Sequence, residues 1–438
     1  MVWYDSRGVH QTLRATLAME AKVTGPIWSV QELLTAPRSD KQEARSTVGP
    51  GALLVWVRAQ ISQGVGRQTQ TATLRAALHE HTGSDSGECP MTDQSISPPI
   101  FKPGERTVSV VIPAFNSEKT LEACLRAVFS SDYPSFEVIL VNDGSTDQTA
   151  SIAAKFPCKQ IDLAKNVGAS AARNRGAQAA KGDFLFFLDA DIIIEKDTLT
   201  KVLRTFVDRP EISALFCSYQ KNTPSGNFCS TYKNLVHHFT HQTAREDAAT
   251  FCGGFGAIYR ECLLRVGGFD ESYRHVSDIE LGYRLYQRGY KIFLNKQIQA
   301  THLKVYSPAK LVRSDLLERA IPWTQIMLKK RIYRNDLNTR YENMASVFTT
   351  FFMLVTLPLI LFRPSLAIVL PLLFLLLFFL NWKFYRFVYG EKGLWFLLRA
   401  VVVNWFGYLY SGLGVVIGMA SYLLHPVLTR RAKPRAGD

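Results

Sequence analysis

Two aspartates directly follow a fully apolar run near the middle of the 438-residue chain. Residues 184–188 read Phe-Leu-Phe-Phe-Leu, and Asp189-Ala190-Asp191 comes next. Carboxylates are hard oxygen ligands that suit Mg²⁺ or Mn²⁺, and a cation held there can neutralise a diphosphate leaving group. An isolated Asp-x-Asp is more often a solvated loop or the acidic start of a helix. Here the pair ends a run that is typical of a buried strand, which favours a metal site.

A second polar motif, Asn-Asp-Gly-Ser at 142–145, follows another apolar run. Asp, Gly and Ser are ordinary in a capped turn, and that is the simpler interpretation. The carboxylate of Asp143 could instead accept a hydrogen bond from the N–H edge of a pyrimidine base.

The elements that would position these groups alternate regularly from Val108 onward. Strands are expected at 108–113, 137–141, 159–163 and 183–188, with helices at 117–130, 146–155, 169–180 and 196–207. Such alternation predicts an α/β fold with a mostly parallel sheet and helices on both faces. Ligands bind at the carboxyl ends of the strands in these sheets. Four polar segments should therefore line one rim, namely 113–116, 142–145, 166–168 and 189–191.

The motifs together resemble glycosyltransferase family 2, in the family's order across nearly two hundred residues. They are Val-Val-Ile-Pro-Ala-Phe-Asn at 110–116, Val-Asn-Asp-Gly-Ser at 141–145, Asn-Val-Gly at 166–168 with Ala-Arg-Asn-Arg-Gly at 172–176, Asp-Ala-Asp at 189–191, and Gly-Gly-Phe-Asp-Glu at 267–271 with Asp-Ile-Glu-Leu-Gly-Tyr-Arg at 278–284. The resemblance implies the GT-A nucleotide-sugar-binding fold. It also implies metal-dependent, inverting transfer of a sugar from a nucleotide diphosphate donor, with a UDP-sugar favoured.

The resemblance also implies roles for residues that contact the donor and the metal. Asp143 corresponds to the base-recognising aspartate and Asp189 to a ribose or water-mediated metal ligand, while Asp191 corresponds to the direct metal ligand. The remaining donor-side residues are Pro113, Ala114 and Phe115 as a wall around the nucleoside, Arg173 as a contact toward the nucleotide, and His302 as a third metal or diphosphate contact. A histidine after a strand is otherwise usually a surface or packing residue.

Inversion needs a carboxylate opposite the diphosphate, to take the proton of the acceptor hydroxyl. Asp278 aligns with this base, although Ser277 stands where relatives usually have a glutamate. Glu280 lies two residues further along a predicted helix and is assigned to the acceptor side, with dipole stabilisation as the simpler alternative. Gly253 and Gly254 resemble the acceptor-side loop, where small residues let the backbone approach a sugar.

Three apolar stretches near the C-terminus predict membrane spans, at 345–362, 364–380 and 394–424. Basic residues before the first span and between the second and third favour a catalytic domain on the cytosolic side of the inner membrane. The basic tail is inconsistent with this orientation, because three spans would place it on the outer side of the membrane. A re-entrant third segment is the alternative.

Composition divides the chain into an N-terminal extension over 1–100, a catalytic domain over 101–310, an amphipathic or interfacial linker over 311–344, transmembrane helices over 345–425 and a basic tail over 426–438. Met91 precedes a Pro-rich linker and is interpreted as the natural start.

The net charge of +14 indicates attraction to anionic lipid and phosphorylated substrates. No basic-aromatic stripe or zinc-finger spacing supports nucleic-acid binding. Seven cysteines without metal-type spacing fit a reducing compartment.

The leading interpretation is a membrane enzyme that glycosylates a lipid or lipid-linked acceptor. A polysaccharide synthase is the alternative enzyme, although no Gln-x-x-Arg-Trp follows the base region. A non-catalytic sugar-nucleotide-binding scaffold is disfavoured, because the metal acids and a base candidate are all present. A dinucleotide dehydrogenase is disfavoured too, since no Gly-x-Gly-x-x-Gly follows the first strand.

Overall fold

The computed structural model of the protein describes residues 106–335 and 337–431. The predictions for the extension over 1–100, including a start at Met91, lie outside the described residues, as does the tail beyond 431.

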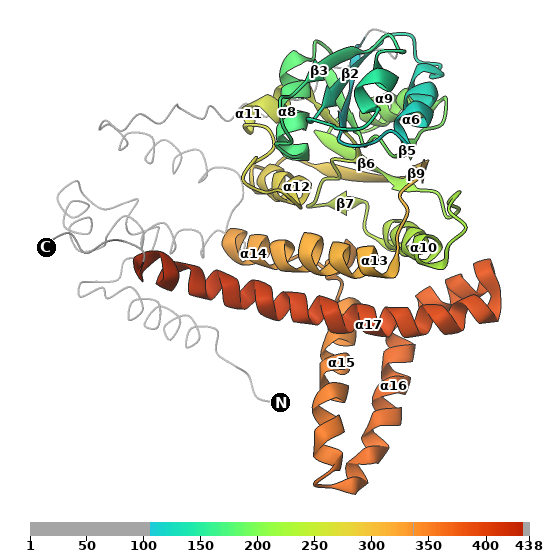
Figure 1. The fold of residues 1–438 in the computed structure, drawn as a ribbon, viewed down its shortest axis with the longest axis vertical. Helices are drawn as coiled ribbons and strands as arrows, with labels where there is room; N and C mark the ends of the chain where they lie inside the picture. Colours follow the sequence, from blue (N-terminus) through green and yellow to red (C-terminus); the bar gives the residue numbers. More distant parts are fainter. Residues whose placement is uncertain (1–105, 336, 432–438) are drawn as a thin grey trace, which may run out of the picture. The chain divides into compact units, whose positions relative to one another are not determined.

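A nine-stranded mixed sheet forms the centre of the first part of this region, in the order β3-β2-β1-β4-β8-β6-β9-β5, with β7 beside β9 (Figure 1). The strands are β1 Val108–Ala114, β2 Phe136–Asn142, β3 Lys159–Asp162, β4 Phe184–Leu188, β5 Ile192–Ile193, β6 Ala214–Tyr219, β7 Asp247–Ala248, β8 Phe255–Tyr259 and β9 Ile292–His302. β1 to β4, β6 and β9 run in one direction, and β8 runs against its neighbours β4 and β6. The predicted mostly parallel sheet is therefore confirmed, with an antiparallel strand inserted beside β4.

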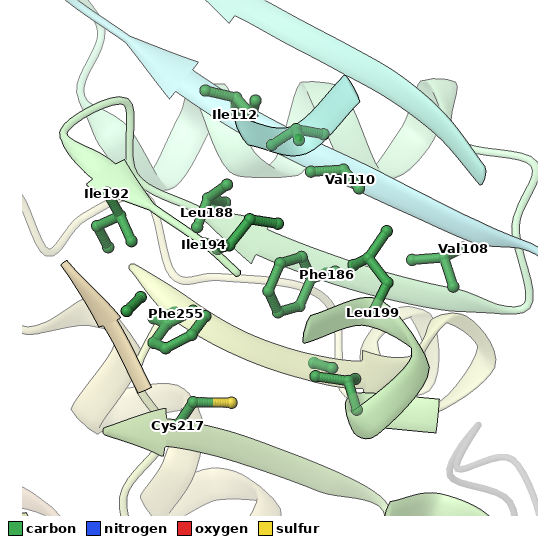
Figure 2. Packing of buried hydrophobic residues seen from close by; sticks show 14 of the residues in the cluster. Val108, Val110, Ile112, Phe186, Leu188, Ile192, Ile194, Leu199, Cys217 and Phe255 are labelled. Carbon is green, nitrogen blue, oxygen red and sulfur yellow. The ribbon is translucent and has the colours of Figure 1, made fainter. Parts of the chain in front are cut away.

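Helices cover both faces of the sheet. They are α6 Leu121–Phe129, α7 Thr149–Ala153, α8 Ala169–Ala179, α9 Thr198–Asp208, α10 Phe228–Thr243, α11 Arg260–Arg265 and α12 Ser277–Gln287. Because side chains alternate along a strand, β1 and β4 feed two separate cores. Val110 and Phe186 pack with Leu199 of α9 on one face (Figure 2), whereas Val111 and Phe187 belong to the core on the other. Each fully buried side chain of this size contributes about 1.5–3 kcal/mol.

The described C-terminal part is helical. It contains α13 Pro308–Asp315, the π-helix η1 Leu316–Ala320, α14 Ile321–Lys330, the 3₁₀ turn η2 Leu337–Thr339, α15 Tyr341–Ile360, the 3₁₀ segment η3 Pro364–Ile368, α16 Val369–Leu380 and α17 Trp382–Arg431. The helical path of α17 breaks at Gly393, where φ is 76° and ψ is −178°.

Among the residues that the structure describes, two helices are long and apolar enough to cross a membrane, Tyr341–Ile360 and Trp382–Leu424. The second predicted stretch, 364–380, is an apolar helical segment with the same bounds, made of η3 and the 12-residue α16. The third predicted stretch lies within Trp382–Leu424, and the number of spans stays a prediction.

Candidate active site

The turn after β4 is tied to two other segments of the chain. The backbone N–H of Asp189 donates to the carbonyl of Gly254, at 2.9 Å. Two residues later, the carbonyl of Asp191 accepts from the N–H of Leu303, at 2.8 Å. The pairing of β5 with β9 sets Ile192 opposite His302. This tethering brings His302 Nε2 to 3.6 Å from Asp191 Oδ2.

Each acid of the pair has a different partner. Arg173 on α8 donates to Asp189 Oδ1 at 2.7 Å, while Asp191 faces His302. Burial raises the pKa of Asp189, and the charge of Asp191 adds to this against the opposing charge of Arg173. Burial acts on Asp191 too, but the hydrogen bond and charge of His302 outweigh it and lower the pKa of that carboxyl. The two acids therefore differ electrostatically, although they are two residues apart.

Arg173 has capacity left for a ligand. The residue is 7% exposed, and its guanidinium carbon lies 5.5 Å from the centre of the Phe269 ring. Its Nε is buried and has no hydrogen-bond partner among the residues that the structure describes. A buried donor without a partner is unfavourable, and an anionic ligand would satisfy it.

Asp278, near the start of α12, lies beside the glycine loop that contacts Asp189. Its Oδ2 accepts from the N–H of Gly253 at 3.1 Å, and its Oδ1 accepts from the N–H of Ile279 at 2.9 Å. The next residue of that loop, Gly254, binds Asp189 through its carbonyl. The loop 253–254 thus brings the metal-site acids and the base candidate together.

A side chain at either glycine of this loop would crowd the charged groups around it. A Cβ on Gly254 would lie 2.5 Å from Asp189 Oδ2, which is closer than atoms approach without displacement. A Cβ on Gly253 would lie 3.2 Å from Arg173 and 3.3 Å from Asp278. The predicted small-residue loop therefore lies between the carboxylates, and close backbone approach explains both glycines.

The predicted nucleoside wall lies at the carboxyl end of β1. Pro113 and Ala114 belong to the strand, and Phe115 directly after it is 46% exposed. Asp143 follows β2, but only 2% of it is exposed. Its carboxylate accepts hydrogen bonds from the Asn166 side chain and from the N–H groups of Val167 and Gly168, at 2.8–3.0 Å. In this structure Asp143 therefore holds the 166–168 loop in place beside the nucleoside wall.

The structure places Glu280 elsewhere than predicted. Its side chain is 2% exposed and forms ion pairs with Arg284 at 2.6 Å and with Lys330 of α14 at 2.9 Å. Asp278 and Glu280 are two residues apart on α12 and so point in different directions. Glu280 joins α12 to α14 and does not face an acceptor.

Arg319 is a further candidate site residue, which no sequence motif singles out. This residue lies on the π-helix η1, and π-bulges are frequent at functional sites. Its Nη1 lies 3.0 Å from His237 Nε2. The His237 ring is tilted against the ring of Tyr219 and stacked on that of His302. Asp315, Tyr306 and Asp278 outweigh burial and raise the pKa of Arg319. The sequence does not distinguish this arginine from others in amphipathic helices, because its position depends on contacts with α10, which is distant in the sequence.

The side chains of Asp191 and His302 suit a cation whose coordination shell a substrate completes. In the described part of the chain, no three His, Cys, Asp or Glu side chains form a group that could hold a metal. Asp191 and His302 supply an oxygen and a nitrogen side by side. Mg²⁺ sites commonly use one or two protein ligands and complete the shell with phosphate oxygens and water.

Residues 109–267 match the sequence profile described as glycosyl transferase family 2. This segment is a glycosyl transferase family 2 domain. It contains the acid pair, Arg173 and the glycine loop, while Asp278 and His302 lie beyond its C-terminal limit. The expected GT-A fold, an α/β fold followed by apolar helices, is confirmed for the described residues.

Two curated relatives of the family 2 domain illustrate its range. Glycosyltransferase GlyA of Streptococcus pneumoniae serotype 4 is 26% identical over 213 residues, which are 45% of this chain and 30% of GlyA. Poly-beta-1,6-N-acetyl-D-glucosamine synthase of Staphylococcus epidermidis is 25% identical over 193 residues, which are 42% of this chain and 47% of the synthase. The chain spans less than half the length of either relative.

Solved structures similar to the chain include two that were determined in complex with a nucleotide sugar. Mannosyltransferase PcManGT from Pyrobaculum calidifontis, in complex with GDP-Man and Mn²⁺, is 18% identical with a TM-score of 0.46 and covers 73% of this chain and 87% of its own. TarS 1-349 of S. aureus, in complex with UDP-GlcNAc, is 18% identical with a TM-score of 0.43 and covers 76% and 94%.

Proposed function

We propose that the protein is an inverting, metal-dependent glycosyltransferase. It transfers a sugar from a nucleotide diphosphate donor, with a UDP-sugar favoured, to a lipid or lipid-linked acceptor at the cytosolic face of the inner membrane. One observation carries the proposal: a single glycine loop contacts both Asp189 of the metal motif and the base candidate Asp278. This shared contact supports assigning Asp189 and Asp278 to one active site.

Asp191 and His302 are the residues that would hold Mg²⁺ or Mn²⁺. The cation would supply charge neutralisation at the departing diphosphate. Asp189 is engaged by Arg173, so this pair sets the position of the turn after β4. The unpartnered Nε of Arg173 is available to donate to an oxygen of the donor.

Asp278 takes the proton of the acceptor hydroxyl as its oxygen attacks the anomeric carbon. A carboxylate that is already held by backbone N–H groups needs little reorganisation to act as a base. The two hydrogen bonds from Gly253 and Ile279 fix the orientation of Asp278, and each carboxylate oxygen keeps a lone pair for the incoming hydroxyl.

The acceptor side is bounded by the helices that precede the apolar region. Arg319 on η1 is close enough to Asp278 for the two charges to interact, and η1 contacts α17. A lipid-borne acceptor would reach Asp278 from this side, so we assign Arg319 to orienting the acceptor. The relative named as a polysaccharide synthase favours a growing glycan as the second candidate acceptor.

The test is turnover by the purified full chain in detergent. Nucleoside diphosphate release is measured with a panel of UDP- and GDP-sugars, with Mn²⁺ or Mg²⁺ or with chelator, and with or without lipid extract. Metal-dependent release that requires lipid supports the proposal, and a single-sugar product distinguishes it from polymer synthesis. Donor binding without turnover under all conditions would indicate a scaffold and refute it. Asp189→Asn with Asp191→Asn should abolish release, and activity that survives both changes would also refute it.

A further inference from the structure

The long helix α17 contacts the other described elements along most of its length. Just after the break at Gly393, the ring of Phe396 lies 4.7 Å from that of Phe228 on α10. Further along, hydrogen bonds join it in turn to α10, α13 and α14. They are Tyr232 Oη to Asn404 Oδ1 at 3.1 Å, Tyr410 Oη to Asp315 Oδ2 at 3.2 Å, and Gln325 Nε2 to Ser421 Oγ at 2.9 Å. Residues 396 to 421 cover about 38 Å of helix, so α17 follows these elements for more than the thickness of a bilayer core.

Glycines allow α17 to pack directly on the helix that carries Arg319. A Cβ on Gly414 would lie 2.6 Å from the Cβ of Ala320 on η1. A Cβ on Gly418 would lie 2.9 Å from the carbonyl oxygen of Ile321 and from Thr324. The backbones therefore meet without intervening side chains, and α17 cannot leave this surface without losing close contact.

The aromatic residues of α17 are spread along the helix. A helix that spans a bilayer concentrates Trp and Tyr at its two ends, at the level of the headgroups. Here Trp395, Trp405, Tyr408, Tyr410 and Tyr422 are distributed over most of the segment. Tyr408 and Tyr410 in the middle of the helix donate hydrogen bonds to Asn381 and Asp315, so contacts within the protein, and not two headgroup layers, place the central aromatic residues.

The remaining surface of α17 is apolar and exposed, with residues from Leu394 to Leu424. Its large members include Leu398, Val402, Phe406, Leu413, Val416, Ile417 and Leu423. Figure 1 shows that α17 runs across the direction of α15 and α16, which form a hairpin. Twenty residues of α15 correspond to about 30 Å of helix, and η3 with α16 to about 28 Å, so each arm of the hairpin is close to the thickness of the hydrocarbon core.

We infer that α17 lies in the plane of the membrane surface on the side of the family 2 domain, while the α15–α16 hairpin crosses the bilayer and returns. The occupant of the exposed face of α17 is one leaflet of the bilayer. The number of crossings is then even, and the basic tail remains on the same side as the domain. This arrangement removes the conflict between a cytosolic domain and a basic tail, since basic segments favour the cytosolic side. The inference rests on the membrane location in the proposed function and is independent of sugar transfer.

Depth in the bilayer distinguishes a helix in the plane from one that spans. A bimane fluorophore is attached to Leu398→Cys and, separately, to Ile417→Cys in the full chain, and the signal of the labelled parent chain is subtracted. The protein is placed in vesicles of phosphatidylethanolamine and phosphatidylglycerol that carry bromines at shallow or deep acyl positions. The two sites are 19 residues and about 28 Å apart along the helix. Equal, shallow quenching is expected; a deep position for either one would overturn the inference.

Sidedness gives a second measurement that does not depend on substrates. In sealed vesicles with the cytosolic face outward, protease should remove an epitope tag placed after Asp438. An impermeant maleimide should label Ser365→Cys at the hairpin tip only after the vesicles are opened. Lys181→Cys on the domain is the control for the outward face. A protected tag would mean that α17 spans, and a tip labelled in sealed vesicles would mean that the hairpin does not cross; either overturns the inference. A failure of the transferase assay would leave both measurements unaffected.

Discussion

Asp278 and Glu280 lie two residues apart on α12, and exchanging each for its amide should have opposite consequences. Asp278→Asn removes the base but keeps an oxygen that can accept from the N–H of Gly253. Glu280→Gln removes a charge that two cations share, Arg284 and Lys330. The first change should therefore affect the reaction, and the second should affect the free energy of unfolding.

The expected magnitudes follow from burial and geometry. Loss of one partner from a buried ion pair costs about 3–5 kcal/mol, because the remaining charges are left without compensation. The side chain of Lys330 is 23% exposed and can turn toward water, so the low end, about 3 kcal/mol, applies to Glu280→Gln. For a domain of this size that lowers Tm by roughly 6–12 °C. Loss of a general base lowers kcat by roughly 10²–10⁴-fold, whereas Asp278→Asn leaves one backbone N–H without its acceptor and should lower the free energy of unfolding by about 1–2 kcal/mol.

The assay combines thermal unfolding with nucleoside diphosphate release at a temperature at which both variants remain folded. Glu261→Gln is the control for charge loss, since Glu261 forms an exposed pair with Arg265 on α11. That change should leave both quantities nearly unaltered, because exposed pairs contribute little. If Asp278→Asn retained full activity while folded Glu280→Gln lost it, the assignment of the base would be wrong.

Two further substitutions test the loop and the acceptor side. Gly254→Ala should reduce turnover by at least tenfold, because its Cβ would displace Asp189, while Gly226→Ala in open space should have no effect; equal activity of the two variants would contradict the geometry. Arg319→Ala should lower kcat/KM for the acceptor by roughly 10–100-fold, the loss expected for one charged hydrogen bond, with donor Kd unchanged. The exposed Arg313→Ala is its control, and a weakened donor Kd in Arg319→Ala would place Arg319 on the donor side instead.

Local sequence patterns were sufficient to predict the first half of the sheet. The predicted strands and helices between 108 and 207 are confirmed, since each apolar run ends in turn residues and each helix is short and amphipathic. The expectation that ligands bind at the carboxyl ends of parallel strands also placed Asp189 and Asp191 correctly, at the end of β4. These features depend on residues close together in the chain, so the sequence alone contains them.

Contacts between distant segments were not predictable in the same way. The ion pair between Glu280 and Lys330 depends on how α12 packs on α14, and the position of Arg319 depends on α10. Hydropathy predicted all three apolar stretches as spans, because it measures composition and not direction, and only the basic tail pointed to a different third segment. What distinguishes α17 is its contact with α10, α13 and α14, which belongs to tertiary structure.

The distribution of partners around the acid pair implies that the cation and the donor bind cooperatively. Arg173 already engages Asp189, so Asp191 and His302 are left as protein ligands, and two ligands alone hold Mg²⁺ or Mn²⁺ weakly. The oxygens of a diphosphate would complete the shell. UDP should therefore raise the affinity for Mn²⁺, and linkage requires that Mn²⁺ raise the affinity for UDP by the same factor.

Titration of Mn²⁺ followed by electron paramagnetic resonance of the free ion, with and without UDP, measures that factor. Asp191→Asn should remove the coupling while UDP still binds weakly through the nucleoside wall. Tight Mn²⁺ binding that is unchanged by UDP would mean that the protein alone supplies the coordination shell, and the assignment of Asp191 and His302 would then be incomplete.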